Sequence, residues 1–110
     1  MVNPWQGEAA LVIDGQERLL KLTLGALAAL EAEMQSDTLI DLVTRFEEGR
    51  FATRDVVALV VAGLRGGGWD IGPADLLDAD IEGGPIEATR VAALLLGRAF
   101  AFPVRIDGAI

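Results

Sequence analysis

Near its start the chain has two apolar segments, one on each side of a tight-turn signal. Residues 8–13 are rich in Ala, Leu, Val and Ile, and an Asp-Gly pair follows at 14–15. This pair favours a two-residue hairpin turn, because such a turn needs positive φ values. Residues 17–23 then form the return strand, with Leu20 and Leu22 on one face. Two strands alone are marginal in water, so we expect the hairpin to pack on helices.

Two apolar stripes at helical spacing follow the hairpin. The first predicts a helix over about 24–35, with Thr23 as its N-cap. The second predicts a helix over about 37–48, which Gly49 ends because glycine adopts the left-handed conformation without strain. We expect both stripes to face the core; they comprise Leu24, Leu27, Leu30 and Met34, and then Leu39, Leu42, Val43 and Phe46.

The most strongly apolar segment lies in the middle of the chain. Residues 53–65 predict a third helix, capped by Thr53 and apolar on nearly every face between Val56 and Leu64. A helix that is apolar all round is normally buried, so we expect this one at the centre of the fold. The run is too short for a membrane span, which needs about 20 residues. The glycines at 66–68 then predict a flexible connection.

Two helices that begin at prolines complete the pattern. Because proline is favoured at the first helical position, we expect a short helix over about 73–80 and a long one over about 85–100. Residues 102–110 form a tail. No linker or internal repeat divides the sequence, so residues 1–110 are expected to form a single α+β domain. Its N-terminal β-hairpin, over about 7–23, would pack on a four- to five-helix bundle.

The composition narrows the classes of function. The chain carries 9 basic and 17 acidic residues, with a net charge of -8. Nucleic acids and anionic membranes are bound by clustered Lys and Arg, whereas these basic residues are scattered. We therefore expect no nucleic-acid or membrane partner, and an acidic surface that provides solubility or faces a basic protein. The absence of Cys and of a signal peptide is typical of a cytoplasmic protein.

No residue pattern predicts a catalytic centre, a metal site or a cofactor site. The glycines at 66–68 lack the lysine of a phosphate loop. A calcium-like run starts at Asp78, but its twelfth position, where a bidentate acid is required, is Thr89. With no His, and with Ser36 as the only serine, a conventional catalytic triad cannot be assembled. We therefore expect a protein that is not an enzyme. A small enzyme or ligand-binding domain is kept as an alternative function, and it would need a deep polar pocket.

Four apolar residues are the candidates for partner binding. Trp69 follows the glycines and, near the surface, would be a favoured hot-spot residue; the alternative interpretation is that it covers the end of the central helix. In the tail, Phe102 precedes an alternation of Val104 and Ile106. This alternation suits strand addition to a sheet edge of this hairpin, of a second copy or of another partner.

Residues 7–31 carry a resemblance to a known family. Their sequence is GEAALVIDGQERLLKLTLGALAALE, in which a hairpin around Asp-Gly precedes Leu-Thr-Leu-Gly-Ala-Leu. It resembles the small tail protein of gene transfer agents, a family grouped with phage tail-assembly chaperones. The Leu-Thr-Leu-Gly-Ala-Leu segment is its most specific part. The likeness extends to about Leu96, through 39–45, 49–51, 55–59 and 62–68.

The resemblance implies a non-enzymatic role in building a tail. Chaperones of this kind bind the tape-measure protein and keep its apolar stretches soluble until tube subunits replace them. The implied partners are therefore the tape-measure protein and the tail tube protein. A structural component of the tail tube or tail tip is the first alternative. The sequence leaves open whether the chain also forms a homo-oligomer.

Overall fold

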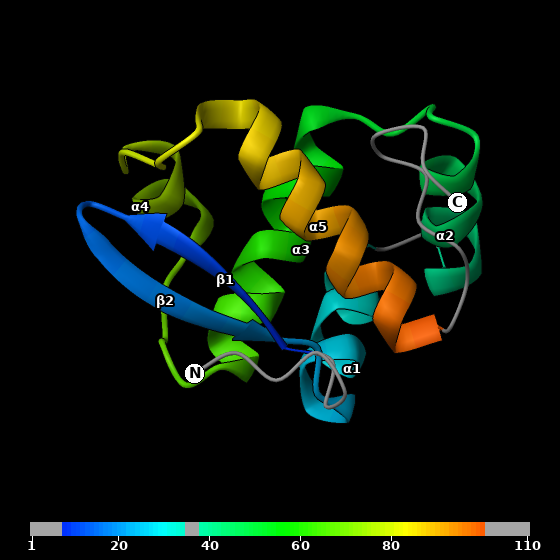
Figure 1. Ribbon diagram of the computed structural model, residues 1–110. Helices are drawn as coiled ribbons and strands as arrows, with labels where there is room; N and C mark the ends of the chain where they lie inside the picture. Colours follow the sequence, from blue (N-terminus) through cyan, green and yellow to red (C-terminus); the bar gives the residue numbers. More distant parts are fainter. Residues whose placement is uncertain (1–7, 35–37, 101–110) are drawn as a thin grey trace.

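The computed structural model describes residues 8–34 and 38–100, which form an antiparallel hairpin followed by helices (Figure 1). The predicted α+β class, with an N-terminal hairpin packed on a helical bundle, is confirmed. The elements are β1 (Glu8–Ile13), β2 (Gln16–Lys21), α1 (Leu24–Glu33), α2 (Leu39–Glu47), α3 (Thr53–Gly66), α4 (Pro73–Leu77) and α5 (Gly84–Phe100).

The hairpin forms at the Asp-Gly turn that the sequence predicts. Asp14 and Gly15 have φ values of 52° and 80°, the left-handed conformation that a two-residue turn of this kind requires. The register places Ile13 opposite Gln16 and Ala9 opposite Leu20. Side chains alternate between the two faces, so the inner face of β1 is buried while much of β2 stays exposed.

Helix α3 is the centre of the fold, as its apolar sequence predicts. It contacts β2, α1, α4 and α5, and α5 crosses in front of it in Figure 1. No other helix of the described chain has so large a share of its length buried. Its buried residues are Asp55, Val56, Leu59, Val60, Val61, Ala62, Gly63 and Leu64.

One face of α3 consists of glycines that lie directly against its neighbours. A Cβ on Gly66 would lie 1.9 Å from the Lys21 carbonyl oxygen, and one on Gly67 would lie 2.1 Å from that of Leu19. A Cβ on Gly63, one turn earlier, would lie 2.8 Å from a methyl group of the α5 residue Leu95. The prediction of a flexible connection is therefore wrong at Gly66 and Gly67. These residues are glycine because β2 leaves no space for a side chain.

The ends of α2 and α3 share one capping arrangement. After α2, the Arg50 amide donates to the Arg45 carbonyl at 2.8 Å, and Gly49 has a φ of 71°. After α3, the Trp69 amide donates to the Leu64 carbonyl at 2.9 Å, and Gly68 has a φ of 104°. Both are Schellman motifs, in which a left-handed residue ends the helix. The predicted stop at Gly49 is confirmed.

Several helix starts differ from the sequence-based prediction. Thr23 caps α1 as predicted, with its hydroxyl oxygen accepting from the Ala26 amide at 3.0 Å. Helix α2, however, is capped by Thr38 rather than starting at 37, because Thr38 forms a capping box with Asp41. The N-cap of α3 is Ala52, so Thr53 is its first residue. Helix α4 is also shorter than predicted and ends at Leu77.

The prediction that Leu24 faces the core is wrong. Leu24 is 84% exposed, and Leu30 is the buried residue of α1. The two residues are six positions apart, which places them about 120° apart around a helix of 3.6 residues per turn. Helix α1 packs on α3 through the side that carries Leu30. Leu24 therefore lies outside the packed face, although its spacing resembles that of the stripe.

Asp55 joins the end of α2 to the start of α3. Its carboxylate accepts hydrogen bonds from Arg45 Nε at 3.2 Å, Arg45 Nη2 at 3.0 Å and the Ala52 amide at 2.8 Å. Asp55 is 7% exposed, so these donors replace the water that burial removes. A single buried carboxylate thus caps the central helix and holds α2 beside it.

We expect Gly66→Ala to lower the free energy of unfolding by about 1–3 kcal/mol, because the new methyl group would overlap the Lys21 carbonyl. Urea denaturation followed by circular dichroism measures the change. Gly25→Ala in α1 is the matched control, since its Cβ would meet nothing closer than 3.9 Å. The control should be neutral or stabilising by up to about 1 kcal/mol. Equal effects of the two substitutions would contradict the close approach of α3 to β2.

We expect Asp55→Ala to destabilise the protein by about 2–4 kcal/mol, since it leaves Arg45 without its buried partner and removes the cap of α3. Chemical denaturation checks this value. Glu48→Ala is the control, because Glu48 pairs with Arg50 where the side chains are 51% and 66% exposed. That loss should cost less than about 1 kcal/mol. A loss below about 1 kcal/mol in Asp55→Ala would show that the contacts of Asp55 with Arg45 and Ala52 do not stabilise the fold.

Candidate protein-binding site

Trp69 lies at the end of the central helix and is only partly exposed. Its amide completes the capping of α3, and its ring packs against the hydrophobic core. The Arg18 guanidinium lies over this ring, 3.9 Å from its centroid. The other guanidinium contact holds Arg18 on its own strand, where Nη2 donates to Gln16 Oε1 at 2.8 Å. Trp69 thus covers the end of α3 and fastens β2 to it through a cation–π contact.

The three other candidate residues, Phe102, Val104 and Ile106, lie outside the described residues. The edge of the hairpin on which a strand could be added is partly occupied. Next to β1, the Asp14 amide donates to the Asp80 carbonyl at 2.8 Å, and the Glu82 amide donates to the Val12 carbonyl at 2.9 Å. Residues 80–82 therefore cover the turn end of this edge, where Ile81 pairs with Ile13. The binding role of the four candidates stays a prediction.

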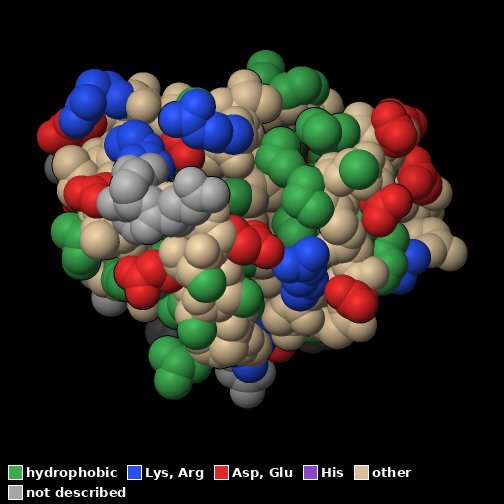
Figure 2. All heavy atoms as spheres, turned by 180° about the vertical axis from the view of Figure 1, so that it is seen from behind, with side chains coloured by type: hydrophobic (Ala, Val, Ile, Leu, Met, Phe, Trp, Pro, Cys, Tyr) green, Lys and Arg blue, Asp and Glu red, His purple; other side chains and the backbone are tan. Residues whose placement is uncertain are grey.

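An apolar groove lies between α3, α4 and the start of α5. It has a volume of about 420 Å³. Figure 2 shows this face of the molecule, with hydrophobic side chains gathered around a hollow. Leu77 on its rim is 67% exposed. The lining is mostly apolar and includes Phe51, Val56, Val57, Val60, Leu76, Leu77 and Ala88.

The α4 side of the groove is acidic. Residues 66–89 contain six acidic residues and no Lys or Arg. Asp78 and Asp80 are exposed, and Asp80 lines the groove itself. On α5, Arg90 donates to Glu87 at 2.9 and 2.6 Å, and these hydrogen bonds hold the pKa of the Glu87 carboxyl below its usual value. An apolar floor therefore adjoins a negatively charged wall.

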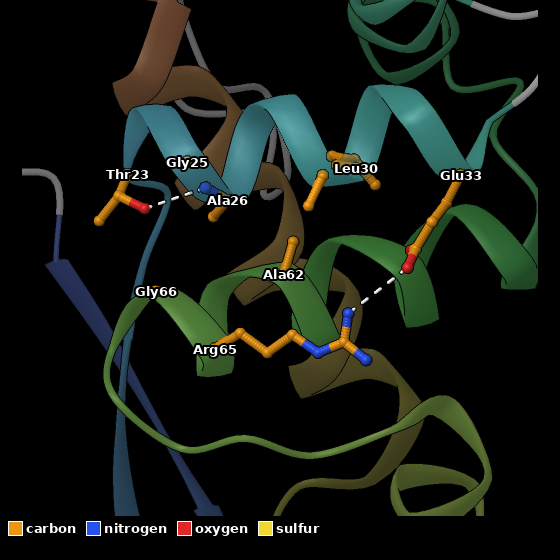
Figure 3. Close-up of a pocket in the computed structure, with 9 residues that line it drawn as sticks. Thr23, Gly25, Ala26, Leu30, Glu33, Ala62, Arg65 and Gly66 are labelled. Atoms are coloured by element: carbon orange, nitrogen blue, oxygen red, sulfur yellow. Dashed lines mark hydrogen bonds and ion pairs between the residues drawn. The ribbon is translucent and has the colours of Figure 1, made fainter.

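A smaller hollow separates α1 from α3 on another part of the surface. It has a volume of about 240 Å³ and is lined largely by small residues. In Figure 3, Ala26 and Leu30 of α1 face Ala62 of α3, and Glu33 reaches Arg65 across the end of the hollow at 3.4 Å. The two helices contact each other, and this hollow shares no lining residue with the groove of α3, α4 and α5.

The described residues hold no group of three or more His, Cys, Asp and Glu side chains that could ligate a metal ion. Over the same part of the chain, none of the helices combines the length and hydrophobicity needed to cross a membrane. The charged side chains of the interior serve the packing of helices instead, as Asp55 and Arg45 do.

The sequence analysis missed the groove because its residues do not share one local pattern. Leu77 is 67% exposed and belongs to no predicted apolar stripe. Val57 lies on the helix that is predicted to be buried, yet it lines the groove and is partly exposed. One feature of the sequence does indicate an exposed apolar surface. Helix α3 is apolar on more faces than the neighbouring elements cover.

A hairpin with partly covered edges, helices packed around α3 and an open apolar groove define a small α+β protein with a surface suited to binding another protein. The model of the family described as "Phage tail tube protein, GTA-gp10" matches residues 6–102, and the chain belongs to this family. The resemblance to a gene transfer agent tail family is thereby confirmed. None of the curated proteins and none of the solved structures matches the chain.

We expect Trp69→Ala to lower the free energy of unfolding by about 1–3 kcal/mol, because the packing of a partly buried indole ring against the core is lost. Arg18→Gln removes the cation–π contact together with the exposed hydrogen bond to Gln16, and it should cost about 1 kcal/mol or less. Thermal and urea denaturation measure both changes. A Trp69→Ala protein of unchanged stability would show that the ring is a free binding residue rather than a cover for α3.

Proposed function

We propose that this protein is a non-enzymatic tail-assembly chaperone. In this role it binds an apolar segment of the tape-measure protein in the cytoplasm while a phage-like tail is built. The observation that carries the proposal is the groove of about 420 Å³, which leaves apolar side chains of α3 and α4 open to a partner. An exposed apolar groove on a protein of net charge -8 marks an interaction surface, because such a patch is otherwise a liability.

Membership of a phage tail family narrows the partner to other proteins of the tail. Among these, a tape-measure protein must keep long apolar stretches in solution before the tube encloses them. A small acidic protein with an apolar groove would shield such stretches and keep the complex soluble through its charge. The tail tube protein is the second proposed partner, since its arrival would displace the chaperone.

A structural component of the tail tube or tail tip is the alternative, and the family's own description favours it. A tube is built by repeating the same heterologous contact from subunit to subunit. Strand pairing is one way to make such a contact, and here residues 80–82 cover the turn end of one hairpin edge while the end of α3 lies against the other. This partial coverage supports the chaperone over a subunit that joins its neighbours through the sheet.

Mass spectrometry of purified particles from the producing strain separates the two functions. Peptide signals are calibrated against the tail tube protein of the same particles. For a chaperone we expect the chain to be absent or present in traces, because it leaves before the tail is complete. A fixed number of copies per particle would make it a structural component and would rule out the chaperone proposal.

A further inference from the structure

We infer that the groove between α3, α4 and α5 binds an amphipathic helix that places its apolar face on α3 and Lys or Arg side chains along α4. The inference rests on the proposed function in one respect, namely that the natural helix is a segment of the tape-measure protein. The preference of the groove for a basic amphipathic helix follows from its lining and its charges, and designed peptides measure this preference.

The lining of the groove favours a helix over an extended peptide. Its floor is formed by Val56, Val57 and Val60 of α3, whose main-chain groups are paired within the helix. An extended segment would bring unpaired amide and carbonyl groups against this apolar floor, and each buried unpaired group is costly. A helix satisfies its own main chain and presents only side chains to the valines.

The length of the groove sets the number of anchors. Along α3 the lining runs from Thr53 to Val60, which is about 11 Å at 1.5 Å per residue. That length matches about two turns of a bound helix, with apolar anchors at i, at i+3 or i+4, and at i+7. The rim residue Leu77 would close over the side of such a helix, which accounts for an exposed leucine at this position.

The acidic residues beside the groove favour a bound helix with basic residues on the flank that faces α4. Asp78 and Asp80 are exposed beside the groove, and Glu82 follows them. No basic residue lies between Arg65 and Arg90 to neutralise this wall. Like charges facing each other are unfavourable, so a partner with acidic residues on this flank is disfavoured and one with Lys or Arg is favoured.

The experiment measures the binding of fluorescent peptides to the full chain by anisotropy. One designed peptide carries three leucine anchors and lysines on one flank; a second replaces the lysines with glutamates; a third is the lysine peptide with a central proline. We expect the lysine peptide to bind at least tenfold tighter than the other two. Its advantage over the glutamate peptide should shrink as salt is raised, because salt screens exposed charges. Equal binding of the lysine and proline peptides, or of the lysine and glutamate peptides, overturns the inference.

Matched variants locate the binding surface. Leu77→Ser should weaken the lysine peptide about five- to tenfold through the lost apolar contact, whereas Leu24→Ser on α1, at a leucine that is 84% exposed against 67% for Leu77, should leave it unchanged. The double variant D78N/D80N should weaken it about two- to fivefold per carboxylate, and E31Q/E47Q on α1 and α2, with the same net charge, should not. Loss of binding in Leu24→Ser with none in Leu77→Ser overturns the groove as the site.

Tape-measure segments tested in the same assay separate this inference from the proposed function. If the lysine peptide binds in the groove and no tape-measure segment binds, the groove stands and the chaperone proposal fails. If a tape-measure segment binds Leu77→Ser and D78N/D80N as tightly as the unmodified chain, the chaperone proposal stands and the groove is overturned.

Discussion

The close approach of α3 to the hairpin is the contact on which the rest of the fold depends. Gly66 and Gly67 bring the helix so near to β2 that a single methyl group would overlap the carbonyl oxygens of Lys21 and Leu19. Gly63 repeats this condition toward α5. Because two strands cannot stand alone in water, the hairpin exists only as a layer on α3 and α5. Three residues without side chains therefore set the spacing of the whole structure.

The same arrangement covers part of each edge of the hairpin. The end of α3 lies along the outer edge of β2, and residues 80–82 cover the turn end of β1. Unpaired strand edges invite aggregation, so this partial coverage reduces the main-chain surface that is open to other strands. Apolar surface is exposed elsewhere instead, on the helices around the groove, where a partner would meet side chains rather than open main-chain groups.

Charge and hydrophobicity act together at the groove. The apolar floor would contribute binding free energy to a wide range of apolar helices, since hydrophobic contact is not directional. The exposed carboxylates of Asp78 and Asp80 beside the floor would add the discrimination that the floor lacks. For a chaperone that holds its partner temporarily, as proposed, this combination of an apolar floor and exposed charges would be useful. Exposed charge pairs strengthen association without making the complex permanent.

The sequence by itself determined the local structure. The Asp-Gly turn, the cap at Thr23, the stop at Gly49 and the apolar character of α3 are properties of neighbouring residues, and each appeared where it was predicted. The family likewise followed from a short segment of sequence. Of the candidate site, the sequence singled out Trp69 and the tail but not the groove.

Only the tertiary structure decided which apolar residues are covered. Leu24 and Leu30 share one helix, yet one is exposed and the other buried, because α3 lies against one side of α1. Gly66 lies in a close contact rather than in a flexible connection because β2, distant in sequence, passes beside it. The groove exists for the same reason: it is the space that α3, α4 and α5 leave between them, and no local pattern records the distance between separate helices.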